Sequence, residues 1–222
     1  MRPAMMTEVI PGPPAQPQCP LRIGDFAPEF QARSTLGEVR LSDYRGKWLV
    51  FFSHPADFTP VCTSEFVAIA RAADAFAALD CGLLGLSVDS LYSHLAWVRA
   101  IHQAFGVTIP FAIVEDPSMV IGQAYGMIEP DAADSSAVRA TYFIDPDGVV
   151  RAMTWYPLNV GRSVDEMLRM VTALQRTAGD DVLAPEGWRP GQDLLVTPPQ
   201  DQDAVFAGGD ETWFYRKRTD SK

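Results

Sequence analysis

Short apolar runs alternate with stretches of helical periodicity through the middle of the chain. Trp48–Ser53, Leu83–Val88 and Phe111–Val114 have the length and composition of buried strands. A helix is predicted to begin near Cys62, and another to run from Tyr92 to Phe105 with Gly106 as its C-terminal stop. The spacing predicts that the second of these helices buries one apolar face, made of Leu91, Leu95, Val98, Ile101 and Phe105.

The pattern then changes to a hairpin and a capped helix. After a brief helical segment at Met119–Tyr125, Thr141–Ile144 and Val149–Trp155 flank a Pro/Gly turn, which predicts an antiparallel hairpin. Ser163 and Glu166 have the spacing of a capping box at the start of the last helix. The order β-α-β-α-β-α-β-β-α is typical of an α/β fold with a central mixed sheet covered by helices on both faces.

The two ends of the chain differ from this middle part. Residues 1–20 carry six prolines and are predicted to form an extended N-terminal extension. Residues 21–177 form the main domain. Residues 178–222 are richer in Pro, Gly and Asp, and we expect an arm or small subdomain that buries its aromatic rings against the main domain or a second subunit; these rings are Trp188, Trp213, Phe214 and Tyr215.

Charge and composition exclude several classes of function. The formal net charge is −10, which argues against nucleic acid and anionic membranes as partners. We find no apolar run long enough to span a membrane and no secretory signal pattern, so a cytoplasmic location is expected. No nucleotide-binding motif or His/Cys cluster is present in the sequence, and we predict neither a cofactor nor a metal.

Cys62 is the most informative candidate for chemistry. Thr59 can cap the helix that follows the strand Trp48–Ser53, and Pro60 suits its first position. Cys62 then lies in the first turn, where the helix dipole favours a thiolate, the nucleophilic form of cysteine. The cysteines Cys19, Cys62 and Cys81 form no C-x-x-C pair, so a lone reactive thiol fits better than a disulfide framework.

The segment Pro55-x-x-x-Thr59-x-x-Cys62 resembles the active-site motif of the peroxiredoxin (AhpC/TSA) family. The sequence of His54–Thr63 resembles that of the one-cysteine branch of this family and its archaeal-type relatives. Further matches extend the resemblance from Leu21 to Pro199. The resemblance implies a thioredoxin-like fold with a C-terminal arm. It also implies a thiol-dependent peroxidase that reduces hydrogen peroxide and organic hydroperoxides through a cysteine sulfenic acid, for antioxidant defence.

The same resemblance implies roles for residues around Cys62, the peroxidatic nucleophile. Arg139 would supply the cation beside the sulfur, Thr59 would hydrogen-bond thiolate and peroxide, and Pro55 would shield the sulfur. Arg162 would be a second cation, and Glu65 would orient the arginines. The alternatives are an ordinary surface or salt-bridge arginine for Arg139, a plain N-cap and strand terminator for Thr59 and Pro55, and a surface ion pair for Arg162 and Glu65.

The roles of His54 and of the other two cysteines stay open to more than one interpretation. His54 either hydrogen-bonds near Cys62 or is a satisfied histidine at the strand end, and we assign it no general-base role. Cys81 is interpreted as a buried core residue. Cys19 could reach a sulfenate but is more simply an incidental thiol, so turnover is expected to need an external thiol such as a thioredoxin-like protein, glutathione or a small thiol.

The resemblance also implies a homodimer that can assemble into a decameric ring. Two other functions compete with the peroxidase. A dithiol oxidoreductase would need a second cysteine in Cys62-Thr63-Ser64-Glu65, which has none. A peroxide sensor or holdase would use oxidation of the same cysteine without efficient turnover, and the residues near Cys62 leave that open.

Overall fold

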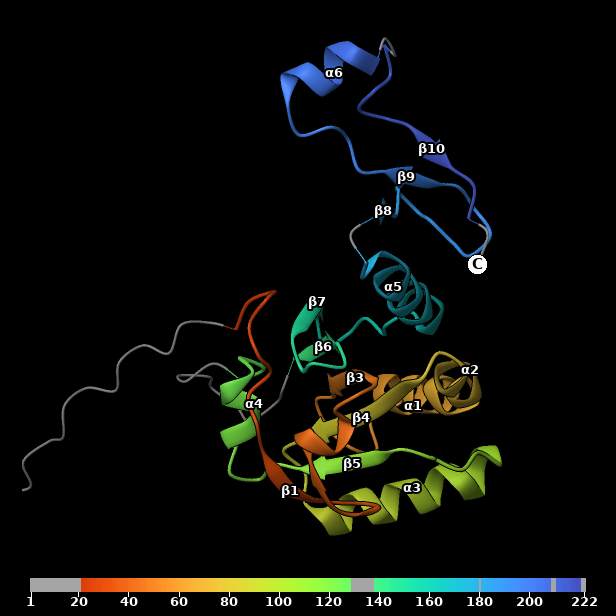
Figure 1. Ribbon diagram of the computed structural model, residues 1–222. Coiled ribbons are helices and arrows are strands. Elements are labelled where there is room, and N and C mark those ends of the chain that lie inside the picture. Colours follow the sequence, from red (N-terminus) through yellow and green to blue (C-terminus); the bar gives the residue numbers. More distant parts are fainter. Residues whose placement is uncertain (1–20, 129–137, 180, 209–210, 221–222) are drawn as a thin grey trace, which may run out of the picture.

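A mixed β-sheet forms the centre of the computed structural model, which describes residues 21–128, 138–179, 181–208 and 211–220 (Figure 1). Within these ranges the sheet has seven strands in the order β2-β1-β5-β4-β3-β6-β7. The strands are β1 (Gln31–Ser34), β2 (Gly37–Arg40), β3 (Trp48–Ser53), β4 (Cys81–Ser87), β5 (Ala112–Glu115), β6 (Arg139–Ile144) and β7 (Val150–Tyr156). β3, β4 and β5 are parallel, whereas the other neighbouring pairs are antiparallel.

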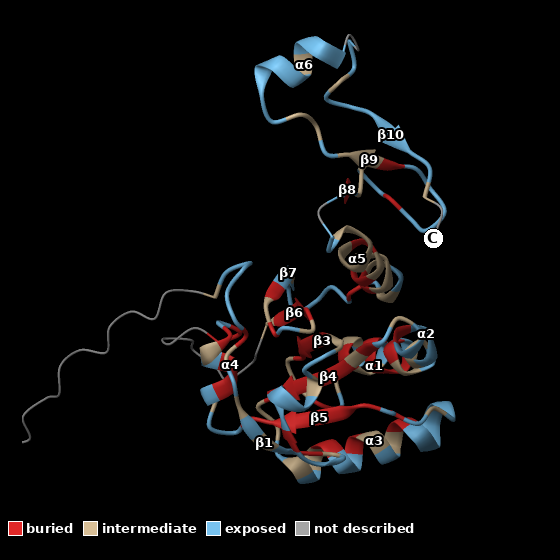
Figure 2. Ribbon diagram, viewed as in Figure 1, coloured by how far each residue is buried: buried red, intermediate tan, exposed pale blue. Residues whose placement is uncertain are grey.

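Helices cover both faces of this sheet, as the sequence predicts. They are α1 (Pro60–Arg71), α2 (Ala73–Ala78), α3 (Leu91–Phe105), α4 (Val120–Ala124) and α5 (Val164–Thr177), with a 3-10 turn, η1 (Leu41–Tyr44). Side chains along β3 alternate between the faces. Leu49 and Phe51 pack with α4 and η1 in one cluster, while Val50 and Phe52 pack with α1, α2, α3 and α5 in the other. Figure 2 shows the buried residues concentrated in these strands and the helix sides that face them.

The hairpin of β1 and β2 was not predicted from the sequence. Its strands have four residues each and mostly expose their side chains, so they lack the apolar alternation that marks a longer strand. Gly37, with φ of +103°, provides the left-handed backbone of the tight turn. The hairpin joins the sheet through antiparallel pairing of Ser34 with Val114 of β5.

The buried face of α3 also differs from the prediction. Leu95 and Phe105 are 43% and 50% exposed, whereas His94 and Trp97 are buried together with Ile101. The reason is that both polar rings find hydrogen-bond partners inside: His94 with Asp57, and Trp97 with Thr63. The predicted face is thus confirmed at Ile101 and Val98, which pack in the core, and wrong at Leu95 and Phe105.

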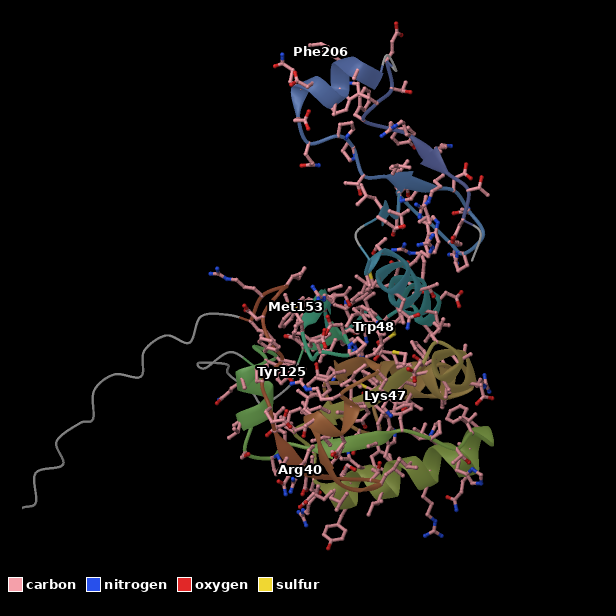
Figure 3. The ribbon with its side chains drawn as sticks, in the orientation of Figure 1. Arg40, Lys47, Trp48, Tyr125, Met153 and Phe206 are labelled. Carbon is pink, nitrogen blue, oxygen red and sulfur yellow. The ribbon has the colours of Figure 1, made fainter. Side chains whose placement is uncertain are left out.

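The C-terminal arm contains a second, three-stranded sheet and a short helix. It comprises β8 (Val182–Leu183), β9 (Leu194–Val196), α6 (Gln202–Gly208) and β10 (Lys217–Arg218), with strand order β10-β9-β8. Trp188 is buried with Val182, Leu194 and Ala173 of α5, as expected, but Phe214 and Tyr215 are 62% and 50% exposed. Figure 3 shows Phe206 at the tip of the arm, away from the main sheet, whereas Trp48, the first residue of β3, lies in the main domain, where it packs against the core cluster that includes α5.

Candidate active site

Cys62 lies in the first turn of α1, directly beyond the end of β3. Thr59 occupies the N-cap position with extended backbone, and Pro60 is the first helical residue, as predicted. The side chain of Thr59 does not cap the helix, however, because its hydroxyl donates to the carbonyl of Ala56 at 2.9 Å. Cys62 itself is fully buried, in the cluster that includes Phe52 and Phe66.

Sheet topology brings Arg139 to the same place. β6 runs antiparallel to β3, and Phe52 pairs with Thr141, so the start of β6 adjoins the end of β3. Nη1 of Arg139 lies 3.4 Å from Sγ of Cys62. The Arg139 side chain is buried and also donates from Nε and Nη2 to the carbonyl of Leu158, at 3.0 and 2.7 Å. It is therefore no ordinary surface arginine.

Glu65 links Arg139 to Arg162. Arg139 donates from Nη1 to Oε2 of Glu65 at 2.7 Å. Arg162 donates from Nε to Oε1 and from Nη2 to Oε2, both at 2.9 Å, and its backbone N–H donates to Oε1 at 2.7 Å. Glu65 and Arg162 are both buried, which rules out a surface ion pair. We refer to Glu65, Arg139 and Arg162 as the arginine cluster.

The arginine cluster carries a net positive charge beside the sulfur. Burial by itself would raise the pKa of Glu65, but the hydrogen bonds and charge of Arg162, followed by the charge of Arg139, outweigh it and hold that pKa below its usual value. Two guanidinium groups and one carboxylate leave an excess of one positive charge. Because Nη1 of Arg139 contacts Sγ, this excess lies where it can stabilise a thiolate or a departing oxygen anion.

Pro55 and Thr59 lie on the loop between β3 and α1, and both are partly exposed. Phe58, between Pro55 and Thr59, has φ of +57°, a left-handed backbone that is uncommon for a residue other than glycine. The loop is fixed at Asp57, whose N–H donates to Oδ2 of Asp89 at 2.9 Å. Among the contacts described, Thr59 donates to Ala56 and not to Cys62.

His54 belongs to a second buried polar group, which we call the histidine cluster: His54, Asp57 and His94. Nε2 of His54 lies 2.9 Å from Oδ1 of Asp57, and Nδ1 of His94 lies 2.8 Å from Oδ2. These residues offer atoms of the type that bind metals, all within 4.8 Å of one another. The two distances are ordinary hydrogen-bond lengths, so hydrogen bonding accounts for the arrangement.

Of the other two cysteines, Cys81 is buried at the start of β4, and burial raises the pKa of its thiol to about 12. An inert core thiol of this kind agrees with its interpretation from the sequence. Cys62 and Cys81 are both free. Cys19 lies outside the described residues.

Sequence reasoning missed the roles that Asp57, His94 and the Leu158 carbonyl have in these contacts. Asp57 lies within the motif segment, and His94 directly precedes Leu95 of the predicted apolar face. A histidine beside the apolar positions of a predicted helix is the one sequence signal that points to the histidine cluster. Nothing in the sequence marks a backbone carbonyl such as that of Leu158.

The fold and this site define a class: cysteine-dependent redox proteins in which one buried thiol begins a helix beside a guanidinium group. Comparison with known proteins makes the class specific. Residues 23–153 match the AhpC/TSA family, and residues 173–207 match the C-terminal domain of 1-Cys peroxiredoxin. The chain belongs to the AhpC/TSA family, the peroxiredoxins.

Individual relatives agree with this assignment. Peroxiredoxin 2 of Caldanaerobacter subterraneus subsp. tengcongensis is 49% identical over 196 residues, which cover 88% of each chain. A peroxiredoxin of the archaeon Methanosarcina mazei is 42% identical, over 82% of this chain and 87% of its own. A solved yeast mitochondrial 1-Cys peroxiredoxin superimposes with a TM-score of 0.80 at 35% identity, covering 90% of this chain and 99% of that one.

These findings confirm the predicted family, the thioredoxin-like fold and the activity. The protein is a thiol-dependent peroxidase, and the sensor or holdase alternative is not favoured. Among the described residues, no helix is long and apolar enough to cross a membrane.

Proposed function

We propose that Cys62 is the peroxidatic residue, and that it reduces hydrogen peroxide and organic hydroperoxides. Its thiolate attacks one peroxide oxygen, the S–O bond forms as the O–O bond breaks, and the departing oxygen takes a proton to leave as water or alcohol. The observation that carries this proposal is the 3.4 Å contact between Sγ of Cys62 and Nη1 of Arg139 in a fully buried setting.

In this proposal the residues around Cys62 stabilise charge, position one another and limit access to the sulfur. Arg139 stabilises the thiolate and the oxygen anion that develops as the O–O bond breaks. Glu65 and Arg162 are positioning residues that hold Arg139. Thr59 reorients its hydroxyl toward the sulfur and peroxide when substrate binds, and Pro55 limits the size of the oxidant that reaches Cys62.

The sulfenic acid is returned to the thiol by an external thiol, without a bound cofactor. That thiol attacks the sulfur and releases water, and a second thiol then cleaves the mixed disulfide. Support comes from Cys62 and Cys81, which are both free, and from the high pKa of the Cys81 thiol. Thioredoxin-like proteins, glutathione and small thiols are the candidate reductants, and the reaction takes place in the cytoplasm.

We further propose a homodimer that can assemble into a decameric ring. Among the strands of the described residues β7 pairs only with β6. Gly24 and Asp25 hydrogen-bond to Val150 at the start of its other edge, and the rest of that edge would accept a second chain. The exposed rings of Phe206, Phe214 and Tyr215 on the arm would also gain burial from a partner. Light scattering distinguishes monomer, dimer and decamer; a monomer at micromolar concentration would contradict this proposal.

Peroxide consumption by matched cysteine variants tests the catalytic proposal. Cys62→Ser is expected to abolish the rate above background with each of thioredoxin, glutathione and dithiothreitol, whereas Cys81→Ser is the matched control and should keep it. Retained activity in Cys62→Ser would overturn the assignment. Arg139→Lys keeps the charge but loses the planar fork, and should lower the rate of the single-turnover reaction roughly 10- to 100-fold.

A further inference from the structure

The histidine cluster is a buried carboxylate shared by two imidazoles. Oδ1 of Asp57 lies 2.9 Å from Nε2 of His54, and Oδ2 lies 2.8 Å from Nδ1 of His94. The three side chains are at most 1% exposed. Burial alone would raise the pKa of Asp57, but hydrogen bonds from the two histidines outweigh it, so that pKa is lowered well below its usual range. Asp57 is therefore ionised and can only accept hydrogen bonds.

This arrangement determines where the imidazole protons are. Each nitrogen that faces Asp57 must donate, which places a proton on Nε2 of His54 and on Nδ1 of His94. Burial lowers the pKa of His54, and the nearby charges of His94 and Arg162 add to that, against the raising effect of Asp57. His54 is therefore a neutral imidazole, and its Nδ1 carries no proton.

The outer nitrogens of the histidine cluster are unusual for buried atoms. Within the described part of the chain, Nδ1 of His54 and Nε2 of His94 have no hydrogen-bond partner. An added proton on Nδ1 of His54 would face no acceptor there, which resists double protonation of that ring. The aromatic side chains packed against His54, Phe66 from α1 and Trp97 from α3, bring no charge that would compensate.

Contacts connect the histidine cluster to the first turn of α1. The His54 ring packs edge-on against Phe66, one turn beyond Cys62, with ring centroids 4.7 Å apart. It also stacks on Trp97 at 5.1 Å, and Nε1 of Trp97 donates to Oγ1 of Thr63, the residue after Cys62, at 3.3 Å. His94 and Trp97, one turn apart on α3, thus contact the loop and the helix turn that carry the reacting thiol.

We propose that His94 is a positioning residue for the reaction of Cys62: by sharing Asp57 with His54, it fixes the loop of residues 54–59 and keeps His54 in the Nε2–H tautomer. The proposal rests on the proposed function of Cys62. Without His94, one buried oxygen of Asp57 would lose its partner, and His54 would become the only counter-ion available to that carboxylate. The loop that carries Pro55 and Thr59 would then depend on the protonation of His54.

The tautomers can be observed directly, because the chain has only three histidines. In ¹⁵N-histidine NMR of the full-length protein, we expect an Nε2–H signature for His54 and an Nδ1–H signature for His94. Single His→Gln variants assign the resonances, with the exposed His102 as the reference. A protonated Nδ1 on His54 at neutral pH would overturn the proposal, whatever the enzyme activity.

Two variants at His94 separate positioning from packing. His94→Asn keeps an N–H donor at the place of Nδ1, whereas His94→Leu fills the space without one. We expect His94→Leu to slow the single-turnover reaction with hydrogen peroxide roughly 10- to 100-fold and to add a protonation step of His54 to the pH–rate profile between about pH 5.5 and 8. His94→Asn should recover most of the rate and remove that step.

Equal rates and unchanged pH profiles in the two variants would show that His94 only fills space, and would overturn the proposal. Melting curves verify folding, and Asp57→Asn, which keeps the shape but not the charge, is the replacement if His94→Leu does not fold; it too should change the pH profile. Failure of the proposed function is distinguishable, since it would appear as retained activity in Cys62→Ser while the histidine tautomers stay as described.

Discussion

Glu65 and Asp57 are both ionised carboxylates buried in the protein, and different kinds of partner stabilise them. Each is a buried carboxylate with two side-chain partners, and each has a pKa held below its usual value by those partners. The partners of Glu65 are two guanidinium groups, whereas those of Asp57 are two imidazoles, of which His54 is kept neutral. The arginine cluster therefore holds an excess positive charge at the sulfur, and the histidine cluster holds a loop.

The difference teaches that burial of a charge is tolerated for different reasons in the two clusters. In the arginine cluster, opposite charges compensate one another and make several hydrogen bonds. In the histidine cluster, two imidazole N–H donors satisfy one isolated negative charge, at the cost of two nitrogens that find no partner in the described part of the chain. Removing the carboxylate should thus have unequal consequences.

The largest effect is expected for Glu65→Ala. It leaves two buried guanidinium groups facing each other without a counter-ion, which should lower the free energy of unfolding by about 3–5 kcal/mol. Urea denaturation measures this, with Glu38→Ala, at an exposed position of β2, as the control with little change. A loss below about 1 kcal/mol would mean that water or other groups compensate the arginines.

A smaller effect is expected for Asp57→Ala. Its removal leaves two buried imidazole N–H donors without an acceptor, in place of two unpaired guanidinium groups, so the loss should be about 1–3 kcal/mol in the same assay. If Asp57→Ala costs as much as Glu65→Ala, the histidines carry charge in the folded protein, and the contrast between the two clusters would be wrong.

Acid should weaken both clusters in the same direction. A carboxyl whose pKa is lower in the folded than in the unfolded state contributes stability that is fully present above its usual pKa, near 4, and is lost as the pH falls below it. Stability measured from pH 6 to pH 2 should therefore fall, and less steeply in Glu65→Gln and Asp57→Asn than in the native sequence. An unchanged slope in both variants would contradict the lowered pKa values.

The smallest effect is expected for Ser163→Ala, at the start of α5. Oγ of Ser163 accepts from the N–H of Glu166 at 3.2 Å, and loss of such a cap costs about 1 kcal/mol. Ser163 directly follows Arg162, so this variant asks whether the cap also helps to place the arginine. We expect the rate of peroxide reduction to stay unchanged. A fall of more than about threefold would mean that the cap at the start of α5 also helps to position Arg162.

Sequence patterns predicted the strands and helices that have strong periodicity or explicit end signals. β3, β4, α3 and α5 were found because apolar runs, Gly106 and the Ser163 cap mark them. The hairpin of β1 and β2 was missed because short exposed strands carry little of that signal. For the site, the family motif located the residues around Cys62, but pattern reasoning does not reveal which partners a buried polar side chain finds.

The arginine cluster illustrates that limit. Glu65, Arg139 and Arg162 come from α1, β6 and the loop before α5, far apart in the chain. From the residues alone, a surface ion pair stayed open as the alternative for Arg162 and Glu65. Only the antiparallel register of β3 and β6 and the loop after β7 bring them together. The same holds for His94, which the apolar pattern did not include in the buried face of α3.

The complete burial of Cys62 has a practical consequence for anyone who labels this protein. A bulky alkylating reagent cannot contact a sulfur with no exposed surface until the first turn of α1 moves. If that opening is slow, the labelling rate becomes independent of reagent concentration and equals the opening rate. Such a reagent would then time the motion of the helix, and a poor labelling yield would say nothing about how nucleophilic the thiol is.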